Sequence, residues 1–520
     1  MPFRQHSLRL CTTVFAVSLS VVVLGAFAVR AEQGDTRSDQ DKDAYHRAML
    51  EADQQIQAAE NGHSEAMQNE EYLTTYIGPR LTGTPAQQKA TQWALDRFRQ
   101  YGLDAHLETG QIPHAWYRGN DWGELLTPVD HWMTVHSAAW SKATPGPISG
   151  RLVSIDENAK PEDISSNSAK YKGVIVLAAS WPPCSLELSQ NPPNAFDAGI
   201  TPPIRQLLRA SLQGGPQAAA IMQRSENLEK VMAALAPAGA AAILRDSCMP
   251  DAMLLMGDAG NGTYEQSAIP VAYISHPDYE WLERLAKSGQ GTFQLDLQGK
   301  FSPGPVPVSD VVAQIKGSEH PEEQVIIGGH LDSWDLAEGA VDNGTGAIAV
   351  LEAARLLKSL NWAPKRTLTF VLFYGEEQDE GGSNAFVEKH AAEIDKVDAV
   401  LIDDLGAGRI SSIPLGDLWP TGVLLGEIYR PLSEVFDLEP ISNGVFSGSD
   451  HDSFLSAGVP AYIALQEAAH YGYAHHSTDD VFELVEPDAL RQQAAVLAAW
   501  MWNVSQMPPS LPHHPKSSGS

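Results

Sequence analysis

The fold is decided by three segments of this 520-residue chain: Q-V-I-I-G-G-H-L-D-S-W-D (324–335), G-A-V-D-N-G-T-G (339–346) and T-L-T-F-V-L-F-Y-G-E-E (367–377). Two short apolar runs, Val325–Ile327 and Leu368–Tyr374, flank the Ala- and Leu-rich segment Gly346–Leu360. This pattern predicts a strand, a helix and a second strand, and such a unit places two parallel strands in a covered sheet. Ligands bind at the carboxyl ends of strands in open α/β sheets, so we expect the functional site where polar residues follow these strands.

Imidazole and carboxylate side chains gather at the predicted strand ends. A further predicted strand, Val397–Ile402, is followed by D-D-L-G, and a later segment reads Y-A-H-H-S-T-D-D (473–480). Zinc accepts His nitrogen and Asp or Glu oxygen, and two zinc ions need about five such ligands when one carboxylate bridges them. The sequence therefore predicts a site for two Zn²⁺ ions per chain, formed by His330, Asp342, Glu377, Asp404 and His476.

Other polar residues have predicted roles beside this set. Glu376 precedes Glu377 at a strand end, where consecutive side chains point in different directions, so it is the candidate general base. Asp332 follows His330 by two residues and is placed to accept the other ring N–H of a ligand histidine. Ser449 and Asp450, in F-S-G-S-D, are candidate supports of the metal ligands.

These motifs together resemble a known family. G-H-L-D-S-W-D, D-N-G-T-G, Y-G-E-E, D-x-G and Y-x-H-H-S-x-x-D are similar to motifs of the di-zinc exopeptidases that include bacterial aminopeptidases, glutamate carboxypeptidase II and plasma glutamate carboxypeptidase (carboxypeptidase Q). The last is the most alike, through H-L-D-S-W-D and the earlier G-P-R-L-T-G-T, and the resemblance covers most of residues 70–505. It implies a mixed, largely parallel α/β sheet flanked by helices, with an inserted β-rich domain of the protease-associated type, matched by Y-K-G-V-I-V-L-A and A-G-A-A-A-I-L.

The resemblance also implies individual roles. Asp342 would bridge the metals, with a cis peptide bond to Asn343, while one site is completed by Glu377 and His476 and the other by His330 and Asp404. Asp404 is preferred to Asp403 because the family motif reads D-x-G. His476 is preferred to His475 because the ligand directly precedes Ser or Thr, with an acid four residues on, which is Asp480 here. Asn343 stands where many relatives have Asp.

The length predicts several parts, because 520 residues exceed one compact core. Arg4 and Arg9 precede an apolar stretch with small-residue cleavage sites, features typical of a secretory signal; an uncleaved anchor is the alternative. We expect a signal peptide at 1–31, the catalytic domain at 32–130 and 301–507, the inserted domain at 131–300 and a disordered tail at 508–520. The inserted domain has two candidate roles, a lid over the site or a homodimer interface.

The composition of the chain disfavours some classes of binding partner. The net charge of −30 disfavours nucleic acid and anionic membrane surfaces. Apart from the signal, no segment is long and apolar enough to span a bilayer, so no stable membrane insertion is expected after cleavage. Of the three cysteines, Cys11 lies in the signal, and Cys184 and Cys248 form either a disulfide or two buried thiols.

We therefore predict a secreted or periplasmic zinc-dependent exopeptidase, of aminopeptidase, carboxypeptidase or dipeptidase type, that acts on short peptides. A non-catalytic receptor- or scaffold-like relative is disfavoured because all predicted ligands and Glu376 are present. A single-zinc acyltransferase of the glutaminyl cyclase kind is disfavoured by the pair His330 and Asp404. A serine hydrolase is disfavoured because the chain has no G-x-S-x-G motif.

Overall fold

The computed structural model describes residues 38–156, 158–178, 216–260, 264–415, 422–441, 446–507 and 513. The predicted signal peptide, the predicted tail apart from His513, and Cys184 lie outside these residues. Cys248 is disulfide-bonded. Within the described ranges, no helix is long and apolar enough to cross a membrane.

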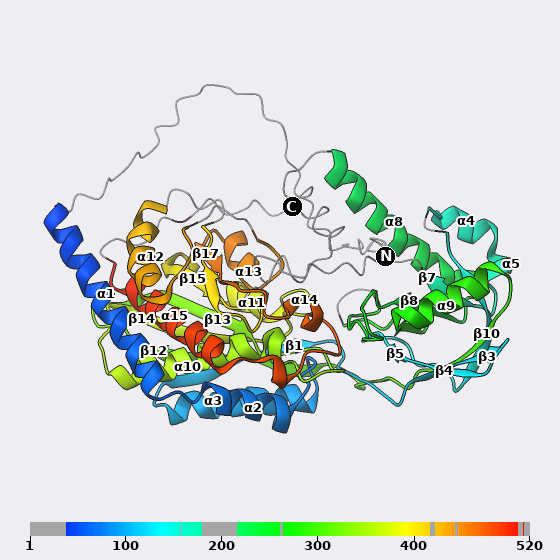
Figure 1. Cartoon of the computed structure of the whole chain (residues 1–520), viewed down its shortest axis with the longest axis horizontal. Helices are drawn as coiled ribbons and strands as arrows, with labels where there is room; N and C mark the ends of the chain where they lie inside the picture. The colour runs from blue at the N-terminus through cyan, green and yellow to red at the C-terminus, as the bar shows by residue number, and fades with distance from the viewer. Residues whose placement is uncertain are drawn as a thin grey trace, which may run out of the picture.

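A six-stranded sheet forms the centre of the larger lobe, in the order β1-β12-β14-β13-β15-β17 (Figure 1). The β13/β14, β13/β15 and β15/β17 pairs are parallel, and the β1/β12 and β12/β14 pairs are antiparallel. The predicted mixed α/β sheet is therefore confirmed. Its strands are β1 (Asp104–Ile112), β12 (Val306–Ile315), β13 (His320–His330), β14 (Arg366–Phe373), β15 (Val397–Ile402) and β17 (Ala461–Ile463).

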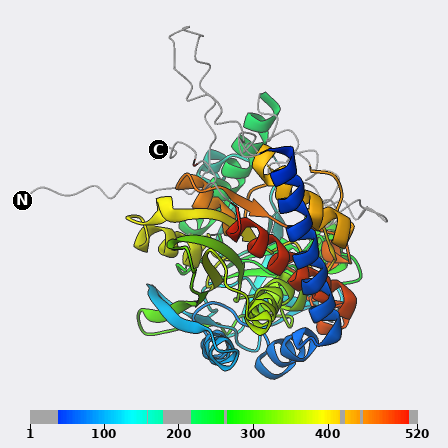
Figure 2. The same ribbon diagram turned by 90° about the vertical axis from the view of Figure 1, so that its left-hand side faces the viewer.

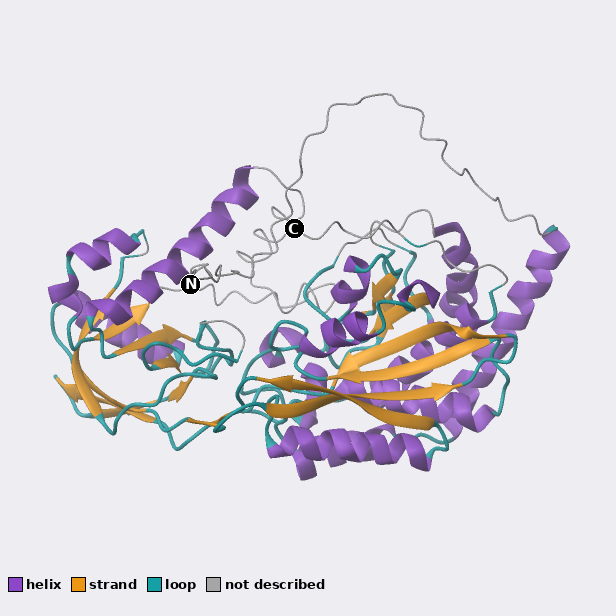
Figure 3. Cartoon of the chain, turned by 180° about the vertical axis from the view of Figure 1, so that it is seen from behind, coloured by secondary structure: helices purple, strands orange, loops and turns teal. Residues whose placement is uncertain are grey.

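Helices cover both faces of this sheet, because its side chains alternate between two cores (Figure 3). Phe370 and Leu372 of β14 pack in the larger core, and Val371 and Phe373 pack in the smaller one. The larger core is closed by α1 (Asp39–Gly62), α2 (Ala66–Glu71), α3 (Pro85–Gln100), α10 (Thr345–Leu360), α12 (Gly422–Phe436) and α15 (Pro487–Ser505), and the smaller one by α11 (Gly381–Lys389) and α13 (His451–Ser456).

Helix α10 is the predicted crossover between β13 and β14. Its Ala- and Leu-rich sequence favours a helix, and it ends where Asn361 takes a left-handed φ of 53°. Almost every residue of α10 is buried, because α15 packs against the side that faces away from the sheet. Helix α1 lies along the outside of α12 and α15 (Figure 2).

The inserted lobe contains an eight-stranded sheet in the order β4-β3-β10-β6-β7-β8-β9-β5. Its central strands β6 to β9 are parallel and lie between α4 and α8 on one face and α9 on the other, so this lobe is α/β rather than only β-rich. The strands are β3 (Trp122–Thr127), β4 (His131–Met133), β5 (Val135–Ser137), β6 (Ile148–Ser154), β7 (Ile175–Ala178), β8 (Ala242–Asp246), β9 (Val271–Ile274) and β10 (Thr292–Asp296), and the helices are α4 (Pro161–Ser166), α5 (Ser168–Tyr171), α8 (Pro216–Ala238) and α9 (His276–Lys287).

The second sheet begins earlier in the chain than expected. Strand β3 precedes residue 131, where the inserted domain was predicted to start, and it pairs with β4 and β10. A short ribbon of β2 (Trp116–Tyr117) and β11 (Lys300–Phe301) lies where the chain passes between the lobes. The structural boundary of the insert therefore falls after β2, not at 131.

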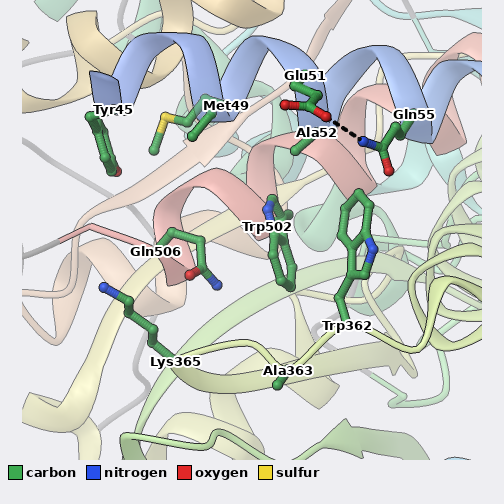
Figure 4. A pocket seen from close by; sticks show the side chains of 11 residues that line it. Tyr45, Met49, Glu51, Ala52, Gln55, Trp362, Ala363, Lys365, Trp502 and Gln506 are labelled. Atoms are coloured by element: carbon green, nitrogen blue, oxygen red, sulfur yellow. Dashed lines mark hydrogen bonds between the residues drawn. The ribbon is translucent and has the colours of Figure 1, made fainter. Parts of the chain in front are cut away.

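A cavity of about 530 Å³ lies between α1, the loop before β14 and the end of α15 (Figure 4). Trp362 and Trp502 form its aromatic floor, with ring centroids 4.7 Å apart, and Tyr45 and Met49 of α1 lie across from them. This cavity is at the amino end of β14. It is thus remote from the opposite edge, where the predicted site residues follow the strands.

Candidate metal centre

The carboxyl edge of the six-stranded sheet brings the predicted ligands together. His330 is the last residue of β13, Glu377 follows β14, and Asp404 follows β15. Asp342 lies in the irregular turn η2 (Ala340–Gly344) that leads into α10, and His476 follows α14 (Tyr471–Ala474). Because β13, β14 and β15 are parallel neighbours, residues that follow them meet at one edge.

Asp342 stands between two groups of donor atoms. Its Oδ1 lies 3.3 Å from His330 Nε2, and this same nitrogen lies 3.0 Å from Asp404 Oδ1. Its Oδ2 lies 3.4 Å from His476 Nε2, which lies 2.8 Å from Glu377 Oε2. The peptide bond between Asp342 and Asn343 is cis, as the resemblance implied.

The chemistry of these residues fits zinc. His330 Nε2, Asp342 Oδ2 and both carboxylate oxygens of Glu377 are buried and form no hydrogen bond within the described part of the chain. Leaving such atoms buried without partners is costly, and coordination of a metal removes that cost. Imidazole nitrogen and carboxylate oxygen are zinc ligands, and the donor atoms of His330, Asp342 and Asp404 lie within 4.8 Å of one another.

Electrostatics of the cluster also favour a cation. Burial and the Asp404 carboxylate raise the pKa of Glu376 well above its usual range. Burial acts to lower the pKa of His330, but the carboxylates of Asp404 and Glu376 outweigh it and hold that pKa well above its usual value. The carboxyl groups at this edge thus oppose one another's ionisation, and a bound divalent cation would favour their charged forms.

Asp332 supports the cluster differently from the prediction. Its backbone oxygen, not its carboxylate, lies within hydrogen-bond distance of His330 Nδ1, at 3.1 Å; the carboxylate is 3.6 Å away. The carboxylate is already engaged, because it accepts hydrogen bonds from Thr82 Oγ1 at 3.0 Å and from the Glu376 backbone N–H at 3.3 Å. The backbone oxygen of Asp332 therefore takes the place predicted for its carboxylate. The effect on His330 is the same, because Nδ1–H donates to that oxygen and Nε2 is left facing the cluster.

The other predicted supports lie beside the cluster. Ser449 Oγ donates to Asp404 Oδ2 at 2.5 Å. The Asp480 carboxylate accepts from the backbone N–H groups of Val341, at 2.6 Å, and Asp342, at 3.3 Å. Asp450 is fully buried near Asp404, and burial raises the pKa of its carboxyl group.

At both ambiguous positions the two candidate residues differ in their contacts, although His475 and His476 both lie with Asp342 in a group whose ligand atoms are within 4.8 Å of one another. Asp404 points into the cluster, whereas the Asp403 carboxylate accepts a hydrogen bond from Gln466. His476 approaches both Asp342 and Glu377, whereas His475 Nε2 lies 3.9 Å from Asp342 Oδ2 and its ring stacks on that of His476. These two histidines are about one-third exposed, at 35% and 33%, so the cluster opens to solvent on their side.

Sequence reasoning missed Arg80 as a structural support. Its buried guanidinium donates to the backbone oxygens of Leu331, Glu338 and Gly339, at 2.8, 2.9 and 2.6 Å. These bonds tie together the chain between His330 and Asp342. The signal was available as the lone charged residue in G-P-R-L-T-G-T, because a charged side chain in such a turn needs partners.

A buried cluster of imidazole and carboxylate groups at the carboxyl edge of an α/β sheet is an arrangement suited to binding metal ions. The sequence profile of peptidase family M28 matches residues 310–501. Carboxypeptidase Q of Xenopus laevis is 30% identical over 448 residues, which are 84% of this chain and 85% of that protein. The chain belongs to peptidase family M28.

Solved structures share this architecture. The crystal structure of a peptidase M28 precursor from Shewanella amazonensis SB2B is 26% identical, with a TM-score of 0.72 over 91% of this chain and 100% of that chain. A zinc aminopeptidase from Bacillus subtilis is 20% identical, with a TM-score of 0.59 over 84% of this chain and 93% of that one, which shows the same fold.

Proposed function

We propose that this chain is an exported zinc-dependent exopeptidase that binds two Zn²⁺ ions and hydrolyses terminal peptide bonds of short peptides. The observation that carries the proposal is the position of Asp342, with one oxygen 3.3 Å from His330 Nε2 and the other 3.4 Å from His476 Nε2. A carboxylate that faces two donor groups suits a bridge between two metal ions. Zinc bound there would polarise the scissile carbonyl and lower the pKa of the attacking water.

The proposed ligand sets follow from the two donor groups. Asp342 is shared, His330 and Asp404 hold one ion, and Glu377 and His476 hold the other. Donation of His330 Nδ1–H to the Asp332 backbone oxygen leaves Nε2 as the ligand atom. Ser449 orients the Asp404 carboxylate by donating its hydroxyl hydrogen bond to it. Asp480 holds the backbone at Asp342 by accepting hydrogen bonds from the N–H groups of Val341 and Asp342.

Glu376 is the proposed general base. It directly precedes the donor Glu377, its side chain is 12% exposed, and its Oε2 lies 3.8 Å from His330 Nε2. The Glu376 backbone N–H donates a hydrogen bond to the Asp332 carboxylate, and this bond holds the backbone from which the Glu376 side chain extends. In this role Glu376 Oε2 takes a proton from the attacking water and delivers it to the nitrogen of the leaving amine.

Metal analysis and peptide hydrolysis of the purified chain test the proposal together. We expect about two zinc ions per chain, loss of hydrolysis on chelation, and recovery when zinc is returned. A folded protein that binds no zinc and cleaves no peptide would be a scaffold-like relative, and the proposal would be wrong. Cyclisation of N-terminal Gln peptides without hydrolysis would instead identify an acyltransferase.

A panel of substrates can identify which terminus of the peptide the enzyme recognises. The names of the relatives differ on this point, with a carboxypeptidase in Xenopus laevis and an aminopeptidase in Bacillus subtilis. Dipeptides and longer peptides with a free or blocked amino or carboxyl terminus separate the types. Loss of cleavage on blocking one terminus identifies the end that the enzyme recognises.

Export and the type of the inserted domain are parts of the same proposal. The N-terminal apolar stretch behind Arg4 and Arg9 supports cleavage near residue 31, so the mature protein from medium or periplasm should begin there. The protease-associated type is supported by the two matched motifs, which form the parallel neighbours β7 and β8. Homodimerisation through the insert is tested by sedimentation of the intact chain.

A further inference from the structure

The inserted lobe contacts the loop that carries His476. The insert segment Leu254–Met256, named here the clamp segment, pairs with residues 476–478 through an antiparallel bridge between Leu255 and Ser477. The Met256 N–H donates to the His476 backbone oxygen at 2.7 Å, and the Thr478 N–H donates to the Leu254 oxygen at 3.1 Å. The Leu254 N–H also donates to Thr478 Oγ1, at 3.2 Å.

This pairing acts on a backbone that needs support. His476 has a φ of 52°, in the left-handed region that residues with a Cβ rarely adopt. Such a conformation persists only where neighbouring structure fixes it. The bond from Met256 fixes the His476 carbonyl, and the edge of Trp334 meets the imidazole with ring centroids 5.8 Å apart.

The clamp segment is itself anchored in both lobes. Met256 is 4% exposed, and its sulfur accepts the Leu336 N–H at 3.3 Å. It belongs to a buried cluster that joins side chains of the insert, such as Trp140, to Trp334 and Tyr374 of the larger lobe. A shift of the clamp segment would therefore disturb this core, so the segment is a rigid support for the histidine loop.

We propose that the clamp segment positions His476 and thereby sets the zinc affinity of the Glu377–His476 half of the site, which rests on the proposed function. The insert is then a necessary part of the peptidase, rather than a lid or dimer interface alone. The His330–Asp404 half provides an internal comparison, because His330 and Asp404 lie at the ends of core strands β13 and β15. The two halves should respond differently when the clamp is loosened.

The test uses the full chain and loosens the clamp segment at two positions; the change at Met256 also removes the sulfur that accepts the Leu336 N–H, so the change at Thr478 is the narrower one. Met256→Pro removes the N–H that His476 accepts, and Thr478→Val removes the hydroxyl that accepts the Leu254 N–H. Thr478→Ser keeps a hydroxyl and is the matched control. Zinc dissociation constants are measured by chelator competition, the Co²⁺-substituted absorption spectrum reports ligand geometry, and kcat and KM are measured at limiting and at excess zinc.

We expect one of the two zinc dissociation constants, that of the ion also lost in Glu377→Gln, to rise about 10–100-fold in Thr478→Val and further in Met256→Pro, with the other one unchanged. The lost kcat should return with excess zinc, and Thr478→Ser should behave as wild type. Unchanged constants in folded Thr478→Val and Met256→Pro, or equal loss of both ions, would overturn the positioning role. If Met256→Pro does not fold, the Thr478→Val and Thr478→Ser pair decides. Wild-type protein without zinc would instead refute the proposed function.

Discussion

Replacing Glu376 with Gln separates proton transfer from metal binding. The amide keeps the size of the side chain and leaves the backbone N–H bond to Asp332 in place, but it accepts no proton. The predicted ligands, such as Glu377 and His476, are untouched. A positioned general base contributes roughly 10²–10⁴-fold to the rate, so kcat should fall by that factor. This fall corresponds to an activation free energy about 3–5 kcal/mol higher. The zinc content should stay that of wild type.

The neighbouring change Glu377→Gln is the matched control. Glu377 Oε2 lies 2.8 Å from His476 Nε2, and neither of its oxygens has a hydrogen-bond partner among the described residues. This variant should lose about one zinc ion per chain together with activity. Zinc is measured by mass spectrometry and turnover with a dipeptide at pH 7. Near-wild-type kcat for Glu376→Gln, or loss of zinc from it, would refute the assignment of roles at this pair.

Three further changes test the surroundings. Asp480→Asn weakens the acceptor that holds the backbone of Asp342, so zinc affinity in chelator competition should fall about 10–100-fold; unchanged affinity would contradict this. Burial raises the pKa of Asp53 to about 8, well above the usual range of a carboxyl group, so the stability that the protonated carboxyl contributes is lost as pH rises from that usual range through 8. Asp53→Asn should therefore raise Tm relative to wild type more at pH 9 than at pH 5, and an equal change at both would argue against it. Arg366→Met removes the buried cation that pairs with Asp398 and should lower the free energy of unfolding in urea by about 3–5 kcal/mol; adding Asp398→Leu should restore much of that loss.

The sequence predicted the centre of the fold because its signals there are local. The apolar runs Val325–Ile327 and Leu368–Tyr374 overlap β13 and β14, and Gly346–Leu360 lies within α10. Each pattern is complete within one element, and because the crossover makes β13 and β14 parallel, the residues that follow both strands lie at the same edge of the sheet. The placement of His330 and Asp404 at that edge followed from strand ends alone.

The start of the insert could not be predicted in the same way. The sequence of strand β3 is W-G-E-L-L-T, and this sequence does not indicate which of the two sheets the strand joins. Its partner β10 lies far along the chain, with the bond from Thr292 to Thr127 spanning 165 positions. Pairing across such a separation is decided by tertiary packing, so the boundary predicted at residue 131 fell too late in the chain.

The support of Asp332 shows a different limit. Sequence spacing placed a carboxylate near His330, which was right about position but wrong about the bonding atom. Thr82, more than two hundred residues earlier, binds the carboxylate and leaves the backbone oxygen for the imidazole. The sequence can therefore predict which residue lies near His330 more reliably than which of its atoms makes the hydrogen bond. Partners that compete for that residue come from distant parts of the chain.

The two halves of the candidate site differ in how they are held, and this difference explains where prediction was hardest. His330 ends β13, whose last six residues are buried, and Asp404 follows β15, which is buried throughout, so the core places both side chains. His476 lies in a partly exposed loop with left-handed backbone, fixed by residues 254–256 of the other lobe, and the bond between Leu254 and Thr478 spans 224 positions. The position of His476 therefore depends on a contact between distant segments, although a local motif was enough to prefer it to His475. We therefore expect the proposed zinc site at His476 to be more sensitive than the one at His330 to substitutions in residues 254–256.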